Sequence, residues 1–140
     1  MPVSLTRAVG FRAMHRLYRP EWSEARNREA FGSLSDPPGH QHDYRCAVTV
    51  AGPVGETQGM VMDLGDLDRI LHDEVVERFD GKHLNQDVPG LSDSGMLLTC
   101  ETIATDVYRR LAPRLPPGVR LERVRIMEDP SLYADCTGLG

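Results

Sequence analysis

The sequence predicts an α+β domain: a four-stranded antiparallel sheet with two helices on one face. Two segments near the start and two near the end alternate apolar and polar residues, as half-buried strands do. Two central segments instead repeat apolar residues at helical spacing. The predicted order is strand, strand, helix, helix, strand, strand. Since 140 residues can bury only a moderate core, we expect one domain over residues 1–140.

The first two strands are predicted over residues 3–17 and 42–51. In the first strand, Val9, Phe11, Ala13 and His15 alternate and therefore share one face. The connection between the strands, residues 19–38, contains Pro, Gly, Ser and charged residues, with a short helical patch at 23–31. Long connections in small domains are often functional.

The two helices are marked by capping residues and by apolar stripes. Asp63 is a plausible N-cap for the first helix, and Thr99 for the second. We expect Pro113 to end the second helix. Residues 80–94 read as a polar loop, and the last two strands are predicted over residues 121–127 and 132–136. The first helix has this apolar stripe: Leu64, Leu67, Ile70, Leu71, Val75 and Phe79.

Composition narrows the class of protein. The net charge is −5 and the isoelectric point is about 5.5, which argues against a general binder of nucleic acid or of anionic membranes. The three cysteines have no paired spacing, which favours a reducing, cytoplasmic environment. No apolar stretch has membrane-spanning length, and residues 1–7 lack the apolar core of a signal peptide.

Three histidines predict a metal site. His40 and His42 are two residues apart on a strand, so their side chains project from one face, about 7 Å apart at the Cα atoms. His15 lies on the apolar face of the first strand. Three neutral imidazoles from adjacent strands can hold Zn²⁺ and leave the fourth position open, as in catalytic zinc sites. Histidines that only form hydrogen bonds are the alternative interpretation.

Several motifs together resemble the 6-pyruvoyl-tetrahydropterin synthase / 6-carboxy-tetrahydropterin synthase family, over nearly the whole chain. The histidines lie within two of them, Phe-Arg-Ala-Met-His-Arg-Leu at 11–17 and Gly-His-Gln-His-Asp-Tyr at 39–44. The others are Phe-Gly at 31–32, the helix entry at 57–67, Asp-Gly-Lys-His-Leu-Asn at 80–85, Thr-Cys-Glu at 99–101 and Ile-Met-Glu at 126–128.

The resemblance implies a T-fold, in which subunits pair edge to edge into barrels, usually as hexamers. It implies Zn²⁺ on His15, His40 and His42. It further implies that Glu128 binds the amidine-like edge of a pterin or related heterocycle, with Thr99 and Glu101 contributing to the substrate site. A carboxylate that accepts two N–H bonds from a planar ring gives the same bidentate recognition as an Arg–carboxylate pair. Two open sheet edges also favour association.

The chain departs from the family pattern at two proton-transfer positions. Leu34 stands where the family has a catalytic Cys, and Gly81 stands where it has a His next to Asp80. His83 could restore an imidazole near Asp80, so we take Asp80 and His83 as the candidate catalytic residues. Cys100, at a helix N-terminus, could instead supply a thiol of lowered pKa, or it could be a small buried side chain.

The leading hypothesis is a zinc-dependent lyase- or synthase-like enzyme that acts on a dihydropterin-like heterocycle, in a specialised or 7-deazapurine-type pathway. Elimination, aldol-type cleavage and isomerisation all fit this site. A non-catalytic protein that binds zinc and a ligand is a second hypothesis. The third is an ordinary 6-carboxy-tetrahydropterin synthase with His83 as substitute base.

Overall fold

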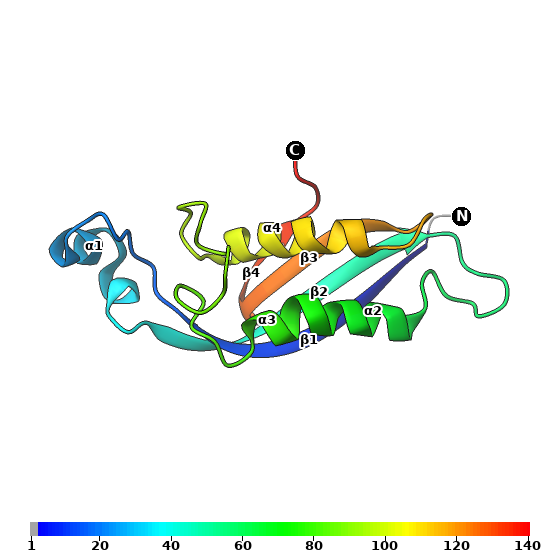
Figure 1. Cartoon of the computed structure of the whole chain (residues 1–140), viewed down its shortest axis with the longest axis horizontal. Helices are drawn as coiled ribbons and strands as arrows, with labels where there is room; N and C mark the ends of the chain where they lie inside the picture. Colours follow the sequence, from blue (N-terminus) through cyan, green and yellow to red (C-terminus); the bar gives the residue numbers. More distant parts are fainter. Residues whose placement is uncertain (1–2) are drawn as a thin grey trace.

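The computed structural model describes residues 3–140 and contains one four-stranded sheet (Figure 1). The strands are β1 (Val3–His15), β2 (His40–Gly52), β3 (Arg120–Asp129) and β4 (Leu132–Cys136). They lie side by side in chain order, and each neighbouring pair is antiparallel. The predicted α+β class and the strand order are confirmed. The first strand ends at His15, two residues earlier than predicted.

Two helical units cover one face of the sheet. α2 (Leu64–Leu71) continues through a π-helical turn (His72–Val76) into α3 (Glu77–Phe79), and this unit packs on β1. α4 (Cys100–Leu111) packs on β3 and β4 and ends in a 3₁₀ turn that contains Pro113. Figure 1 shows both units on the same side of the strands.

The predicted helix caps are confirmed. The Asp63 carboxylate accepts a hydrogen bond from the backbone N–H of Asp66, and the Thr99 hydroxyl accepts one from Thr102. Each bond satisfies a donor that the first helical turn leaves without a partner. The two caps therefore fix where α2 and α4 begin, and the second cap lies at the candidate site described below.

The long connection between β1 and β2 is ordered. It contains α1 (Glu24–Phe31), followed by a 3₁₀ turn (Gly32–Ser35), and it lies beyond one end of the sheet (Figure 1). The buried side chain of Asn27 bonds to the backbone N–H and C=O of Arg19 and to the carbonyl of Ser23. These bonds tie the start of the connection to α1, and the backbone N–H of Leu17 donates to the Leu34 carbonyl at 3.0 Å.

The segment after α3 is more buried than the sequence predicts. Leu84, Val88 and Leu91 are buried, although residues 80–94 read as a polar loop. The reason is that the segment runs along β1: the N–H of Met14 donates to the Lys82 carbonyl, and the N–H of Leu84 donates to the Met14 carbonyl. This short parallel pairing turns the apolar side chains of the loop into the core.

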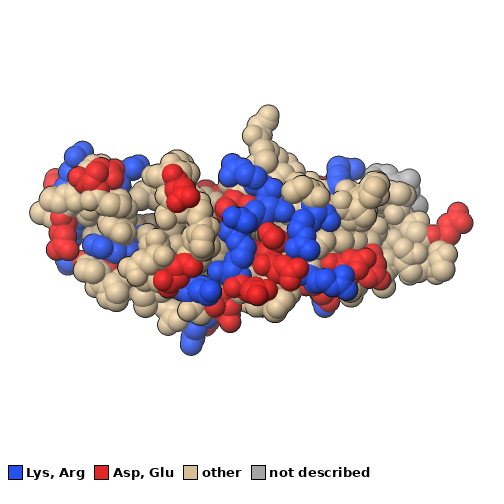
Figure 2. Space-filling model, in the orientation of Figure 1, with Lys and Arg blue, Asp and Glu red and all other residues tan. Residues whose placement is uncertain are grey.

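Charged side chains of both signs are interspersed over the helical face (Figure 2). One ion pair there is largely buried: Arg78 of α3 donates to Asp106 of α4 at 2.9 Å and joins the two helical units. No helix within residues 3–140 is long and apolar enough to cross a membrane.

Candidate functional site

The register of β1 and β2 brings the three predicted histidines together. His15 lies directly opposite His40, and Ala13 lies opposite His42. The ring centroids are 4.5 Å apart for His15–His40, 5.1 Å for His15–His42 and 4.9 Å for His40–His42. One potential ligand atom from each ring lies within 4.8 Å of the other two. The predicted convergence on one point is therefore confirmed.

The hydrogen bonding and protonation of the histidine nitrogens suit a metal ion. His15 is 1% exposed, and its Nδ1 lies 2.7 Å from the Leu98 carbonyl oxygen. Nδ1 must donate to that oxygen, so a neutral ring presents the lone pair of Nε2 to the other histidines. The Nε2 atoms of His15 and His42 are buried and have no hydrogen-bond partner. Buried polar atoms without partners are rare unless an ion or ligand satisfies them.

Burial also keeps this site in the form that binds metal. Desolvation by burial lowers the pKa of His15 to about 4. The hydrogen bond to Leu98 opposes this change with a smaller effect, and the nearby histidines lower the pKa further. Desolvation and His42 lower the pKa of His40, against the opposing effect of Glu128. Both rings are therefore neutral near pH 7, as ligation requires. The donor set and its protonation fit Zn²⁺.

Glu128 reaches this cluster from a β-bulge in β3. Met127 pairs with Tyr133 and Asp129 pairs with Leu132, so Glu128 is the extra residue of the bulge. Bulges often redirect a side chain beside an active site. One Glu128 carboxylate oxygen lies 3.4 Å from His15 Nε2 and 3.5 Å from His42 Nε2.

A cavity of about 160 Å³ joins the histidines to the predicted substrate residues. Thr99 and Glu101, at the start of α4, line it together with Glu128. Leu34, at the position of the expected thiol, is 45% exposed and lines the same cavity. The complete lining is His15, Leu17, Leu34, His40, Thr99, Cys100, Glu101, Glu128 and Leu132.

Asp80 and His83 are not among the residues that line this cavity. Asp80 is exposed and its carboxylate accepts a hydrogen bond from the Arg12 backbone at 2.9 Å. The His83 imidazole bonds through Nε2 to the Pro38 carbonyl at 2.7 Å. Within this chain the hydrogen bonds of Asp80 and His83 therefore go to other partners and not to each other. Between them, Gly81 turns the chain with φ +74° and donates to the Arg12 carbonyl.

Cys100 is a buried side chain rather than an activated thiol. Burial raises its pKa to about 11, and the nearby carboxylates of Glu128 and Glu101 act in the same direction. Of the two interpretations of Cys100 left open by the sequence, the structure thus favours the small buried side chain.

Tyr44 lies beside the histidine cluster, and no role was predicted for it from the sequence. Its hydroxyl is buried without a hydrogen-bond partner, and its ring centroid lies 5.4 Å from that of His42. The ring also stacks on Phe11, with centroids 4.9 Å apart. Strand parity was the available signal, because Tyr44 shares a face with His40 and His42.

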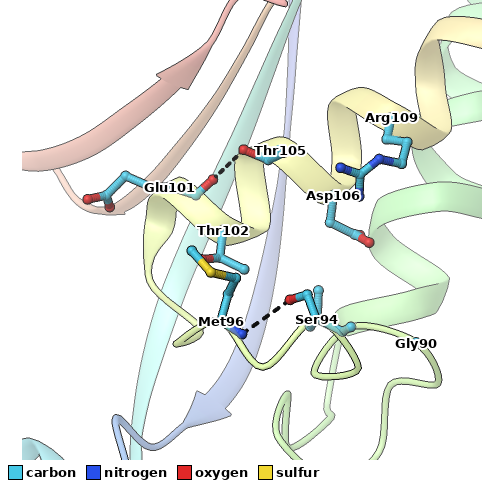
Figure 3. A pocket seen from close by; sticks show the side chains of 9 residues that line it. Gly90, Ser94, Met96, Glu101, Thr102, Thr105, Asp106 and Arg109 are labelled. Carbon is cyan, nitrogen blue, oxygen red and sulfur yellow. Dashed lines mark hydrogen bonds between the residues drawn. The ribbon is translucent and has the colours of Figure 1, made fainter. Parts of the chain in front are cut away.

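A second cavity of about 210 Å³ runs along α4, where the loop carrying Ser94 and Met96 faces Thr102 and Thr105 (Figure 3). Glu101 lines both cavities, so they are neighbours. Within residues 3–140, the one cluster of possible metal ligands is that of the three histidines. A metal ion held by these histidines would therefore lie beside the smaller cavity.

Comparison with known proteins agrees with this geometry. The family model for 6-pyruvoyl tetrahydropterin synthase matches residues 4–138. The 6-pyruvoyl tetrahydrobiopterin synthases of Pongo abelii and Homo sapiens are 37% and 36% identical to the chain over 124 residues. Each alignment covers 89% of this chain and 83% of the relative.

A solved structure extends the agreement to the fold. The 6-pyruvoyl tetrahydropterin synthase of Caenorhabditis elegans superposes with a TM-score of 0.89 and 30% identity, over 99% of this chain and 97% of that one. The predicted T-fold of the subunit is thereby confirmed. On the evidence of its sequence, its sheet and its histidine cluster, this chain belongs to the 6-pyruvoyl tetrahydropterin synthase family.

Proposed function

We propose that this chain is a zinc-dependent, lyase- or synthase-like enzyme acting on a dihydropterin-like or related heterocycle, with altered proton-transfer residues. One observation carries the proposal: three histidines converge beside a cavity that Glu128 also lines, and the Nε2 atoms of His15 and His42 are buried without a hydrogen-bond partner. Membership of an enzyme family of pterin synthesis supports the substrate class. The three free, buried cysteines are consistent with a cytoplasmic location.

Each part of the cavity has a distinct role in this proposal. His15, His40 and His42 would hold Zn²⁺, which polarises vicinal oxygens on a substrate side chain and acidifies a neighbouring C–H. Glu128 accepts two N–H bonds from the amidine-like edge of the ring. Leu34 provides an apolar wall and cannot transfer a proton.

Asp80 and His83 remain the proposed proton carriers, and this role depends on an oligomer. Both lie against β1, an edge strand of the sheet, and outside the cavity of their own chain. Pairing of β1 with an edge strand of a second copy would cover this edge. We propose that the assembly is a hexamer, and that Asp80 acts at a cavity completed by a neighbouring copy.

One observation favours a non-catalytic function as the second candidate. Leu34 replaces the expected thiol, and the pKa of about 11 at Cys100 prevents that thiol from replacing it at neutral pH. A protein that only binds zinc and a heterocycle would tolerate both features. An ordinary 6-carboxy-tetrahydropterin synthase with His83 as base is less well supported, because His83 does not line the cavity of its own chain and is not hydrogen-bonded to Asp80.

Turnover and metal content test the proposal together. We expect about one zinc per chain in the wild type and loss of that zinc in His40→Ala and His42→Ala. The matched control is His72→Ala, which changes an exposed histidine on the helical face and should keep the bound zinc. Zinc-loaded protein should convert dihydropterins slowly and should lose that turnover with a chelator. Full zinc in both His40→Ala and His42→Ala would exclude the proposed metal site. Zinc binding without turnover of any dihydropterin would favour the non-catalytic candidate.

A further inference from the structure

The second cavity, along α4, contains an arginine without an acidic partner. Arg109 lines this cavity, and in the described part of the chain it takes part in none of the ion pairs. Asp106 and Thr102 line the cavity from the same helix, and Ser94 and Met96 line it from the facing loop (Figure 3). A guanidinium that no carboxylate occupies can bind a planar or tetrahedral anion through several N–H groups.

The acidic side chains at this cavity leave its charge positive. Asp106 already has two partners, since Arg78 donates to it at 2.9 Å and the Nε atom of Arg110 lies 3.7 Å from it. The Nη2 atom of Arg78 is also buried without a hydrogen-bond partner. In Figure 3 the side chain of Glu101 points away from the loop. Arg109 thus adds a charge that no neighbouring acid balances, in a chain whose net charge is −5.

Two hydroxyl groups supply further donors beside this charge. The Ser94 hydroxyl accepts a hydrogen bond from the backbone N–H of Met96 at 3.2 Å, so its own proton remains to be donated. The Thr102 hydroxyl has a long contact of 3.4 Å with the Thr99 hydroxyl. A phosphate group offers three strong acceptor oxygens, which suits one guanidinium and two hydroxyl groups.

The cavity has room for more than a phosphate group, and part of its wall is apolar. Its volume of about 210 Å³ is about seven times the share of one water molecule in the liquid. The buried side chain of Leu91 lines it, and so does Met96, which is 61% exposed. Methionine adapts its flexible side chain to apolar partners of irregular shape. The walls therefore suit a ligand with a small apolar body as well as an anionic end.

We infer that the second cavity binds a small phosphate monoester. Its phosphate binds Arg109 and the hydroxyls of Ser94 and Thr102, and its apolar body packs on Leu91 and Met96. This ligand is separate from the heterocycle of the smaller cavity, so the inference goes beyond the proposed function. It is also independent of the proposed zinc site, because none of the three histidines lines the second cavity.

Titration calorimetry at low ionic strength, with phenyl phosphate and with inorganic phosphate, tests the inference. The zinc-loaded wild type should bind phenyl phosphate at least fivefold more tightly than inorganic phosphate, because only the former buries apolar surface. Arg109→Gln should weaken the binding of both at least fivefold, as expected when one side of a charge-assisted hydrogen bond is removed. Met96→Ala should weaken the binding of phenyl phosphate alone.

The matched control is Arg69→Gln, which makes the same change of charge at an exposed arginine of α2 outside the cavity. Both affinities should stay within twofold of the wild type. Metal-depleted wild type should still bind phenyl phosphate, and Arg109→Gln should still weaken that binding. Far-UV circular dichroism checks that the variants fold.

The outcomes separate the inference from the proposed function. No binding of phenyl phosphate at millimolar concentration would overturn the inference, and so would equal affinities of wild type and Arg109→Gln. Equal weakening in Arg69→Gln would reduce the effect to general electrostatics, and loss of binding with the metal would place the phosphate on the zinc; either result overturns the site. Equal affinities for the two phosphates would overturn the choice of a monoester. A wild type that binds no zinc but binds phenyl phosphate through Arg109 would overturn the proposed metal site and support the inference.

Discussion

Acidification should destabilise the metal-free protein through His15. The pKa of this ring is about 4 in the folded protein and about 6.5 when exposed. Between these values the unfolded chain binds a proton that the folded chain does not. The contribution of His15 to the free energy of unfolding is therefore complete above pH 6.5 and is lost as the pH falls toward 4. At pH 5 the unfolded ring is almost fully protonated and the folded ring about one-tenth, which corresponds to a loss of about 2 kcal/mol relative to pH 7.5.

Urea unfolding at pH 7.5 and pH 5.0, with a chelator present throughout, measures this effect. The loss of unfolding free energy between the two pH values is compared between the wild type and His15→Gln. The amide of this glutamine can still donate to the Leu98 carbonyl. The variant should lose about 2 kcal/mol less than the wild type on acidification. His40, whose pKa is also lowered, contributes in both proteins. His72→Gln, at an exposed position, should match the wild type. Equal losses in wild type and His15→Gln would refute the reasoning.

Three further outcomes are expected. Asp63→Ala should lower the free energy of unfolding by about 1 kcal/mol in urea denaturation, because the cap of α2 is lost; an unchanged midpoint would contradict this. Light scattering should give a hexamer at micromolar concentration, and a stable monomer would rule out the edge pairing. Leu34→Cys combined with Gly81→His should raise turnover of dihydroneopterin triphosphate more than either change alone. A side chain at position 81 meets no atom within 4 Å, although φ +74° costs about 1–2 kcal/mol of stability. No gain in the double variant would show that other residues carry the protons.

The sequence was sufficient for the parts of the molecule that follow a strict period. Strand alternation has a period of two, so the face of His15, His40 and His42 was predictable before their pairing was known. Helix caps were equally predictable, because Asp63 and Thr99 satisfy backbone donors within their own first turn. Both rules depend only on residues that are close together in the sequence, so they can be applied to a single sequence.

The remaining features depend on contacts between distant segments. The bulge at Glu128 exists only through the pairing of β3 with β4, and no pattern in β3 alone marks it. The burial of Leu84 and Val88 follows from pairing of their loop with the end of β1. The hydrogen bonds of Asp80 and His83 go to Arg12 and Pro38, which lie far away in the sequence.

The hydrogen bond from His15 to the Leu98 carbonyl has a mechanical consequence. Leu98 immediately precedes Thr99, the cap of α4, and ends the loop that forms one wall of the second cavity. A metal-bound imidazole cannot rotate, so it fixes the carbonyl that it binds. A metal ion on the histidines would therefore also hold the junction between this loop and α4, beside a cavity that none of the three histidines lines. Amide exchange in residues 90–99 should therefore slow when the metal binds, so this loop reports whether the metal is bound.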